Sequence, residues 1–417
     1  MKNVLFLCSH DSELTGHAKY VYNLIPPDIN KKIVTYTSLK AKEQYAFYYS
    51  KSFIFRVVRK LKYYMFFLKR WIEFGEPVRI NNDHGEYCFY HHDDCCMSAK
   101  AILKKCKGFK PDLIAVYWVA DFVSPKTIRD LYMMTKAQIL IVFVDEAPLA
   151  GGCHFHCDCD NYLIDCKSCP ALISGKKLAE KQMQNRKKYL NGLPIIINGT
   201  PYDIEKAKNT DTYSDCKYLE WIHLPKATIY NKEESRKKYE INNDEFVIFI
   251  GASNLKDPRK GVKYSLDAIN LFAKFHPNIT LLFLGRKPES SLIDKRIKVI
   301  SPGFLSYDGM CEAMCASDVF VSSTIADSGP MTVNIAFALG LPTISFDIGI
   351  AHTLIIHKDT GYIAKYKNVE SIKEGLIYIS SLSKEDRKAM NERCIKRINN
   401  LHTPDWWYIL LRNQCSE

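Results

Sequence analysis

The sequence predicts an α/β protein with two domains, each a mainly parallel sheet with helices on both faces. A chain of 417 residues is too long for one ordinary hydrophobic core. Short apolar runs alternate with helical patterns in the first half of the chain and again in the second, as in parallel sheets. A polar interval near 210–230 separates the two series. We therefore place the domains at 1–215 and 216–399.

The individual elements follow from where the apolar runs begin and end. In the first domain we expect strands at 4–8, 33–36, 112–118 and 138–144 and helices at 18–24 and 124–133. In the second we expect strands at 246–250, 279–284, 319–321 and 342–346 and helices at 264–275, 307–316 and 331–339. The last helix of that series stops at Gly340, a residue that commonly ends helices.

Composition narrows the class of protein. Hydrophobic content of 47% and charged content of 25% are typical of a soluble globular protein. No run of about 18 apolar residues is present, and the opening apolar strand is too short for a signal peptide. We therefore expect a cytoplasmic protein whose 15 cysteines are reduced core residues or metal ligands. The net charge of +12 favours an anionic partner.

Two segments of the second half have the residues of a phosphate site. The turn Asp327-Ser328-Gly329-Pro330 opens a short apolar helix, so backbone N–H groups and the helix dipole are available to an anion. Upstream, Gly251 ends a strand, and the run 259–261, Arg-Lys-Gly, opens the next helix. Together these segments predict a phosphate site outside the carboxyl ends of parallel strands.

This arrangement resembles the nucleotide-sugar domain of GT-B glycosyltransferases, in particular glycosyltransferase family four. The resemblance is strongest over 246–363 and implies two Rossmann-like domains facing a central cleft. It also implies that a C-terminal helix, 400–417, crosses back onto the first domain. The residues it assigns to the nucleotide-sugar donor are Gly16, Arg259, Lys260, Asp327, Ser328, Gly329, Pro330, Met331 and Asn334. Asp327 is also the catalytic candidate.

The activity implied is that of a hexosyltransferase. A sugar would move from a nucleotide-sugar to a saccharide acceptor, lipid-linked, in surface polysaccharide synthesis, with retention of configuration and no metal in catalysis. Three positions depart from the family pattern. Ile335 stands where a second carboxylate is usual, Val144 where a His is usual, and Gly16 alone remains of two glycines. These departures favour an alternative, a catalytically silent GT-B-fold binding protein or partner subunit of a transferase.

A cysteine-rich loop occupies 151–170. Cys153, Cys159, Cys166 and Cys169 resemble a Gly-Gly-Cys-His and Cys-x-x-Cys-Pro pattern of one bacterial polysaccharide branch of the family. The Cys166-x-x-Cys169 pair has zinc-ligand spacing, and four thiolates would close the coordination shell of a structural zinc ion. Reduced thiols packing a compact loop explain the pattern equally well.

Four further residues are candidates on the acceptor side. Asp145 and Glu146 follow a predicted strand, where α/β sites assemble, and either could contact acceptor hydroxyls or cap the next turn. Trp118 also ends a strand, and its ring could stack on a sugar or belong to the core. His154 belongs to the Gly-Gly-Cys-His motif.

The segment 51–70 combines seven basic residues with large apolar ones and contains no acid. On a helix, Arg56, Arg59, Lys60 and Lys62 gather on one side, with Phe55, Val58 and Phe66 elsewhere. Such a helix suits an anionic membrane surface, so we expect peripheral association with the inner face of the membrane. Nucleic acid is the less favoured partner because no nucleic-acid motif accompanies the segment.

Overall fold

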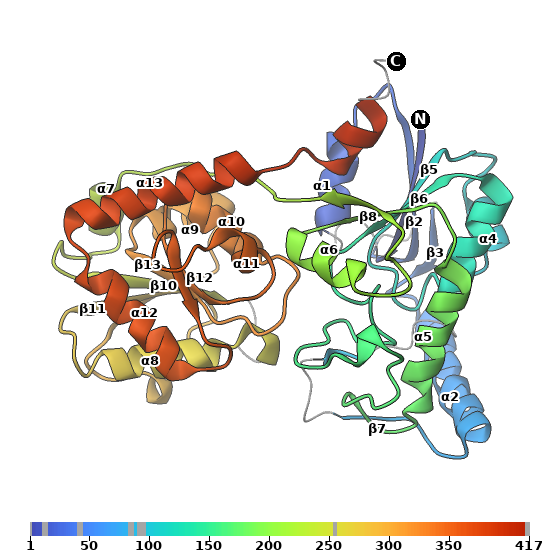
Figure 1. The fold of residues 1–417 in the computed structure, drawn as a ribbon, viewed down its shortest axis with the longest axis horizontal. Helices are drawn as coiled ribbons and strands as arrows, with labels where there is room; N and C mark the ends of the chain where they lie inside the picture. Colours follow the sequence, from blue (N-terminus) through green and yellow to red (C-terminus); the bar gives the residue numbers. More distant parts are fainter. Residues whose placement is uncertain are drawn as a thin grey trace. The chain divides into compact units, whose positions relative to one another are not determined.

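The computed structural model describes residues 2–10, 16–39, 45–81, 87–89, 97–252 and 257–412. The chain forms two compact units, which are coloured along the sequence in Figure 1. The first unit is Met1–Trp221 together with Pro404–Glu417, and the second is Ile222–Thr403. The boundary therefore lies after Trp221, whereas the sequence placed it at 215.

The first unit is built on a parallel sheet. Within the described residues its order is β3-β2-β1-β5-β6-β8-β9, and every pair is parallel. The strands are β1 (Asn3–His10), β2 (Asn30–Ser38), β3 (Ala46–Tyr49), β5 (Leu113–Val116), β6 (Gln138–Val142), β8 (Ile195–Gly199) and β9 (Lys217–Glu220). Two short strands, β4 (Arg79–Ile80) and β7 (Leu172–Ser174), form a separate antiparallel pair.

Helices connect these strands, and both faces of the sheet are buried. The helices are α1 (Gly16–Leu24), α2 (Phe53–Phe74), α3 (Ala99–Lys105), α4 (Pro125–Thr135), α5 (Lys177–Leu190) and α6 (Pro201–Lys208). Because successive side chains of a strand point to opposite faces, Leu5 and Leu7 of β1 belong to one core and Val4 and Phe6 to another.

The second unit repeats this plan. Its sheet has the order β12-β11-β10-β13-β14-β15 among the described residues, again all parallel. The strands are β10 (Phe246–Ala252), β11 (Ile279–Gly285), β12 (Lys298–Gly303), β13 (Val319–Ser322), β14 (Thr343–Phe346) and β15 (Gly361–Ala364). The helices are α7 (Lys232–Lys238), α8 (Val262–Phe272), α9 (Tyr307–Cys315), α10 (Met331–Ala338), α11 (Ile350–Leu354), α12 (Val369–Ser381) and α13 (Lys384–Leu401).

The helices and strands expected from the apolar runs are confirmed, with ends that shift by a few residues. The expected strand 138–144 stops at Val142, and the apolar residues Phe143 and Val144 lie outside it. Sequence patterns gave no ranges for the strands β3, β4, β7, β8, β9, β12 and β15 or for the helices α3, α5, α6, α7, α11, α12 and α13.

The C-terminal segment is part of the first unit. Trp406 is fully buried there, and its Nε1 donates to the Tyr117 hydroxyl at 3.1 Å. A second indole, Trp221, donates to Asp405 Oδ1 at 3.1 Å. The segment ends in a π-helical turn, Tyr408–Arg412, rather than in a regular α-helix. Figure 1 shows it in red beside α1. These contacts attach the end of the chain to the sheet on which it began.

The burial of Trp406 predicts a large cost for its removal. Trp406→Ala is expected to lower the free energy of unfolding of the first unit by about 3–5 kcal/mol, because a large buried side chain and its hydrogen bond are lost. Urea unfolding followed by circular dichroism measures this. Tyr408→Ala, two residues on and half exposed, should cost less than about 1 kcal/mol. Equal unfolding midpoints for the two variants would contradict the packing described.

Candidate functional site

The second unit has a crevice where its strand order reverses. From β10 the chain adds β11 and β12 on one side of the sheet and then returns to place β13 on the other side of β10. The loops after β10 and β13 therefore leave in opposite directions. In open parallel sheets this is where ligands bind, outside the carboxyl ends of the strands.

The loops after β10 and β13 are held in close contact. The backbone N–H of Ile325 donates to the Arg259 carbonyl at 2.7 Å, and Ser323 Oγ donates to the Gly261 carbonyl at 2.7 Å. Gly261 has φ +58°, and a Cβ at this position would lie 1.9 Å from the Ser323 carbonyl oxygen. Only glycine fits at position 261, so backbone packing requires the glycine of the Arg-Lys-Gly run, whereas Arg259 and Lys260 supply its charge.

A pocket of about 370 Å³ opens at this point. The residues that line it come from the ends of β10, β11 and β13, from the segment after β12, and from α8, α9 and the start of α10. Its polar and charged lining residues are Lys260, Ser265, Ser322, Ser323, Thr324, Asp327 and Thr332. Its apolar rim includes Phe304, Leu305, Met310 and Met331. Lys260 and Asp327 are the two charged side chains among the described lining residues.

Lys260 and Asp327 form an ion pair inside this pocket. Lys260 Nζ donates to Asp327 Oδ2 at 2.6 Å, and the other carboxylate oxygen accepts the backbone N–H of Gly329 at 3.1 Å. Both side chains are partly exposed. The carboxylate therefore fixes the lysine and the turn before α10 at once. The N–H groups of Met331 and Thr332, in the first turn of α10, lie at the same wall.

Other predicted donor residues lie differently. The guanidinium of Arg259 pairs with Asp257, with Nη2 2.7 Å from Oδ2, and Arg259 is not among the residues that line the pocket. Asn334 is buried, and its amide donates to the His223 carbonyl at 2.7 Å. Ile335 belongs to the hydrophobic core. Ser328 is also buried, whereas Gly329, Pro330 and Met331 line the pocket.

The first unit has its own strand-order reversal, between β1 and β5. His10 ends β1, and its ring lies 5.0 Å from that of Trp118, which follows β5. His10 Nδ1 also shares a 2.8 Å hydrogen bond with Thr37. Gly16 begins α1 after this point, and residues 11–15, which precede it, lie outside the described residues.

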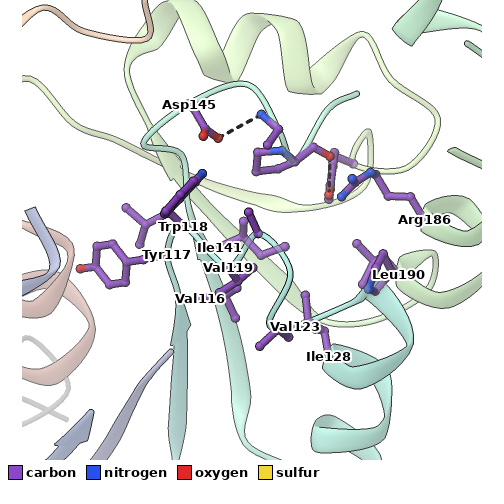
Figure 2. A pocket seen from close by; sticks show the side chains of 16 residues that line it. Val116, Tyr117, Trp118, Val119, Val123, Ile128, Ile141, Asp145, Arg186 and Leu190 are labelled. Carbon is purple, nitrogen blue, oxygen red and sulfur yellow. Dashed lines mark hydrogen bonds between the residues drawn. The ribbon is translucent and has the colours of Figure 1, made fainter. Parts of the chain in front are cut away.

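Three of the acceptor-side candidates meet in the first unit. His154 Nδ1 pairs with Asp145 Oδ2 and also lies 2.9 Å from Trp118 Nε1. Asp145 Oδ1 in addition accepts the N–H of Ala147 at 3.0 Å, so it caps the turn after β6. Trp118 and Asp145 line a pocket of about 50 Å³ that is otherwise mostly apolar. Figure 2 shows Asp145 at one end of this pocket and Ile128 and Leu190 toward the other.

Glu146 points into the protein instead. Its carboxylate accepts Lys206 Nζ of α6 at 2.5 Å and the backbone N–H of His156 at 3.0 Å. Burial raises the pKa of neighbouring Asp203 to about 8, with the charge of Glu146 as the next cause, so Asp203 is mostly protonated at neutral pH. Lys206 therefore neutralises Glu146 alone. Because Glu146 also accepts the N–H of His156, the pair links the cysteine-rich loop to α6.

The four cysteines of the predicted zinc site share one neighbourhood. Together with His156 and Tyr162 they surround a cavity of about 10 Å³. Burial, together with the neighbouring cysteines, raises the pKa of Cys166 to about 12 and that of Cys169 to about 11. No group of three or more His, Cys, Asp or Glu side chains in the described part of the chain is arranged to hold a metal ion. Structural zinc thus stays a prediction.

A glycine shapes the start of the same loop. A Cβ on Gly151 would lie 2.2 Å from the Ala179 carbonyl oxygen of α5, so the loop packs directly on the helix backbone there. This contact gives a physical reason for the first glycine of the Gly-Gly-Cys-His motif.

Several lining residues were not found from the sequence. Ser322 is the last residue of the buried strand β13, and Ser323 and Thr324 follow it directly. A polar run at the carboxyl end of a predicted strand was the available signal. Phe304 had no such signal, because nothing local distinguishes it from a core residue.

Comparison with known proteins identifies the fold. Residues 231–397 match the family described as "Glycosyl transferases group 1". The sucrose-phosphate synthase of Thermosynechococcus elongatus aligns over 98% of this chain and 96% of its own, with a TM-score of 0.60 and 12% identity. Anabaena Alr3699/HepE, solved with UDP and glucose, aligns over 96% and 95%, with a TM-score of 0.54 and 12% identity. A glycosyltransferase from Rickettsia africae aligns over 96% and 94%, with a TM-score of 0.54 and 14% identity. A sequence comparison with curated proteins gave no match.

The chain thus has the GT-B fold, with two Rossmann-like units. The group 1 domain match and the full-length structural matches together support a glycosyltransferase. The family match covers the unit that contains the Lys260–Asp327 pocket.

The cysteine cluster gives a prediction about metal content. If Cys153, Cys159, Cys166 and Cys169 bind one structural zinc ion, elemental analysis of protein purified without chelator should give about one zinc per chain. Cys166→Ser should then abolish the zinc content, whereas Cys394→Ser, a buried cysteine of the second unit, should leave it unchanged. Folded wild-type protein free of metal would leave thiol packing as the explanation.

Proposed function

We propose that this protein transfers a sugar from a nucleoside-diphosphate donor to a saccharide acceptor. The observation that carries the proposal is the pocket of about 370 Å³ at the strand reversal of the second unit. It combines a lysine, a helix N-terminus and a row of hydroxyl side chains with an apolar rim. A nucleoside diphosphate, which joins a negatively charged diphosphate to a planar aromatic base, matches these features.

The diphosphate is assigned to the Lys260 side of the pocket. Lys260 offers a compact cation, and Met331 and Thr332 offer N–H groups at the positive end of α10. In the structure Lys260 is neutralised by Asp327 at 2.6 Å. A bound diphosphate would share the lysine with this carboxylate, so Asp327 orients the cation and limits how tightly the anion binds.

The base is assigned to Phe304. This ring follows β12, lines the pocket and is 72% exposed, although large aromatic side chains usually find cover. A planar base would cover it by stacking, which contributes about 1–3 kcal/mol per base. Leu305 and Met310 extend the apolar surface beside it.

The chemistry needs stabilisation of the leaving group. The bond from the anomeric carbon to the diphosphate oxygen breaks with its electron pair remaining on the diphosphate. The oxygen of the acceptor hydroxyl bonds to the same carbon, and its proton passes to the departing diphosphate. Negative charge therefore grows where Lys260 and the start of α10 lie, and fixed positive groups at that point lower the barrier. Retention of configuration is proposed from the resemblance to family four, and comparing the anomeric NMR signals of donor and product tests it.

The acceptor is assigned to the first unit. Trp118 offers a ring for stacking on a sugar, and His154 with Asp145 offers hydrogen-bonding and proton-transfer groups beside it. We propose a lipid-linked saccharide of surface polysaccharide synthesis as the acceptor class. Assaying transfer to a lipid-linked saccharide and to the same saccharide in free form tests this.

The diphosphate and base assignments can be separated by titration. Lys260→Ala should weaken binding of both inorganic pyrophosphate and the preferred nucleoside diphosphate by roughly 10- to 100-fold, because a charge-assisted hydrogen bond is lost. Phe304→Ala should weaken the nucleoside diphosphate by about 10-fold and leave pyrophosphate unchanged. Calorimetry with a panel of nucleoside diphosphates measures both.

Lys263→Ala is the matched control for these titrations. Lys263 is 84% exposed, lies on α8 and pairs with Asp267 rather than with the pocket. Its replacement should leave both affinities at the wild-type value. If Lys260→Ala and Lys263→Ala behave alike, Lys260 is not part of a diphosphate site.

The role of Asp327 distinguishes a transferase from a silent binding protein on the same fold, which the burial of Ile335 in the core favours. Asp327→Asn removes negative charge from the pocket but keeps its shape. Nucleoside-diphosphate affinity should stay equal or rise, and donor turnover should fall at least about 10-fold because Lys260 loses its orienting partner. Wild-type protein that binds nucleotide but turns over no nucleotide-sugar donor with any acceptor would favour the silent protein.

A further inference from the structure

Helix α2 is attached to the first unit by one side only. Its buried residues are Phe55, Phe66 and Arg70. Phe55 stacks on Tyr48 with ring centroids 4.8 Å apart, and Arg70 lies 5.5 Å from the Phe66 ring centroid. At about 100° per residue, these three positions fall within about a quarter of the helix circumference. Phe67 and Phe74 also pack against this core while partly buried, and most other residues of the 22-residue helix are exposed.

The side opposite the core is apolar, not polar. At about 100° per residue, the positions roughly opposite Phe55 and Phe66 are taken by large hydrophobic side chains. These outward residues are Phe53, Ile54, Val57, Leu61, Tyr64, Met65, Leu68, Trp71 and Ile72. Their exposed fractions run from 40% for Val57 to 78% for Ile72. We call them the outward face. A surface helix of a soluble protein normally presents polar residues there.

Basic residues flank the outward face on both sides. Arg56 and Lys60 lie along one edge and Lys69 along the other, and all three are exposed. Arg56, Arg59, Lys60 and Lys62 lie within one half of the helix circumference, but Phe55 and Phe66 lie in that half too, so the expectation that the two rings lie elsewhere is wrong. Arg59 and Lys62 lie on the side of the helix nearer the unit, and Lys62 lies over the Tyr48 ring at 5.8 Å.

No acid interrupts this pattern. The sequence from Lys51 to Ile72 contains no Asp or Glu. The first acid, Glu73, is engaged by Arg70 of the same helix and by Lys181 of α5. The helix thus presents an apolar strip between two positive borders, fixed to the unit at its C-terminal end. Figure 1 shows α2 in blue beside α5.

We propose that the outward face of α2 docks this protein on an anionic lipid bilayer, with the helix parallel to the membrane plane. The apolar strip enters the boundary between headgroups and acyl chains, and the flanking bases contact anionic headgroups. An apolar protein partner would explain the strip, but it would not explain why its borders carry Arg56 and Lys60 on one side and Lys69 on the other, with no acid. Trp71 and Tyr64 suit the headgroup level, where aromatic rings with a polar atom concentrate.

The helix lies on the bilayer rather than across it. No helix among the described residues is long and apolar enough to span a membrane. The capped ends of α2 also fix its length. Ser52 Oγ accepts the Phe55 N–H at 3.4 Å, and Gly75, with φ +74°, ends the helix through its N–H to the Trp71 carbonyl at 2.9 Å. The docking surface is therefore preformed.

Vesicle binding of the full-length protein tests the proposal. Wild-type protein should co-sediment with vesicles of phosphatidylglycerol and phosphatidylcholine at low salt, and much less with phosphatidylcholine alone. At about 1 M salt binding should fall, since the screening length drops to about 3 Å. Arg56→Gln/Lys60→Gln/Lys69→Gln should weaken binding about 100-fold, from about 1 kcal/mol for each base. Leu61→Ser/Leu68→Ser should weaken it at least about 10-fold without touching the core.

Matched controls separate this surface from general charge. Lys384→Gln/Lys388→Gln/Lys396→Gln removes three exposed bases from α13 of the second unit and should leave binding unchanged. Trp71 is a reporter, because its fluorescence should shift to the blue with vesicles and this shift should vanish in Trp71→Phe while binding persists. The proposal is overturned if wild-type protein ignores anionic vesicles at low salt. It is also overturned if the α13 and α2 triple variants bind anionic vesicles equally well. A third contrary outcome is a wild-type dimer, seen by light scattering, that Leu61→Ser/Leu68→Ser dissociates, with neither protein binding vesicles.

Discussion

The candidate donor site depends on how closely two loops approach each other at the strand reversal of the second unit. A Cβ on Gly261 would lie 1.9 Å from the Ser323 carbonyl oxygen, so any other residue would push the loops apart. A Cβ on Gly349 would lie 2.5 Å from the Asp327 carbonyl oxygen. Gly261 directly follows Lys260, and Gly349 packs on the backbone of Asp327, so each glycine fixes the backbone at one member of the Lys260–Asp327 pair. The position of the charges is thus set by backbone packing, which long flexible side chains could not achieve alone.

The first unit also has a reversal of strand order, but its candidate residues are held by a long loop. Its sheet also reverses order, but the segment after β6 is a long loop whose one helical turn is the short 3₁₀ helix Asn161–Leu163 among the described residues. Such a loop needs other sources of order. It obtains them from Glu146 with Lys206, from Gly151 against α5 and from the buried cysteines. The loop in turn brings His154 to Asp145 and Trp118. Structural residues and candidate binding residues therefore alternate along this segment. Of two adjacent carboxylates, Asp145 pairs with His154, whereas Glu146 pairs with Lys206.

Helix α2 shows why the two sides of one amphipathic pattern must be assigned by packing. Apolar residues occupy most of its circumference, so periodicity cannot say which of them face the core. The structure selects Phe55 and Phe66 for the core and leaves a larger apolar strip outside. If that strip rests on a bilayer, the candidate acceptor residues of the same unit work near a membrane surface. The two proposals made above, docking on the bilayer through α2 and a lipid-linked acceptor, are then consistent with each other.

The sequence by itself determined the alternation of strands and helices in two units, because continuous apolar runs of four to eight residues leave few alternatives to buried strands. It also located the turn at Asp327 and the bases at 259–260, because glycine, proline and charge mark such turns locally. It could not place Arg259 on Asp257, Asn334 on the His223 carbonyl or Glu146 on Lys206. It also missed Phe304 at the pocket rim. Only the tertiary structure decided these, because strand order and loop contacts join residues that are distant in sequence, and a side chain's partner depends on what the fold places within hydrogen-bonding distance.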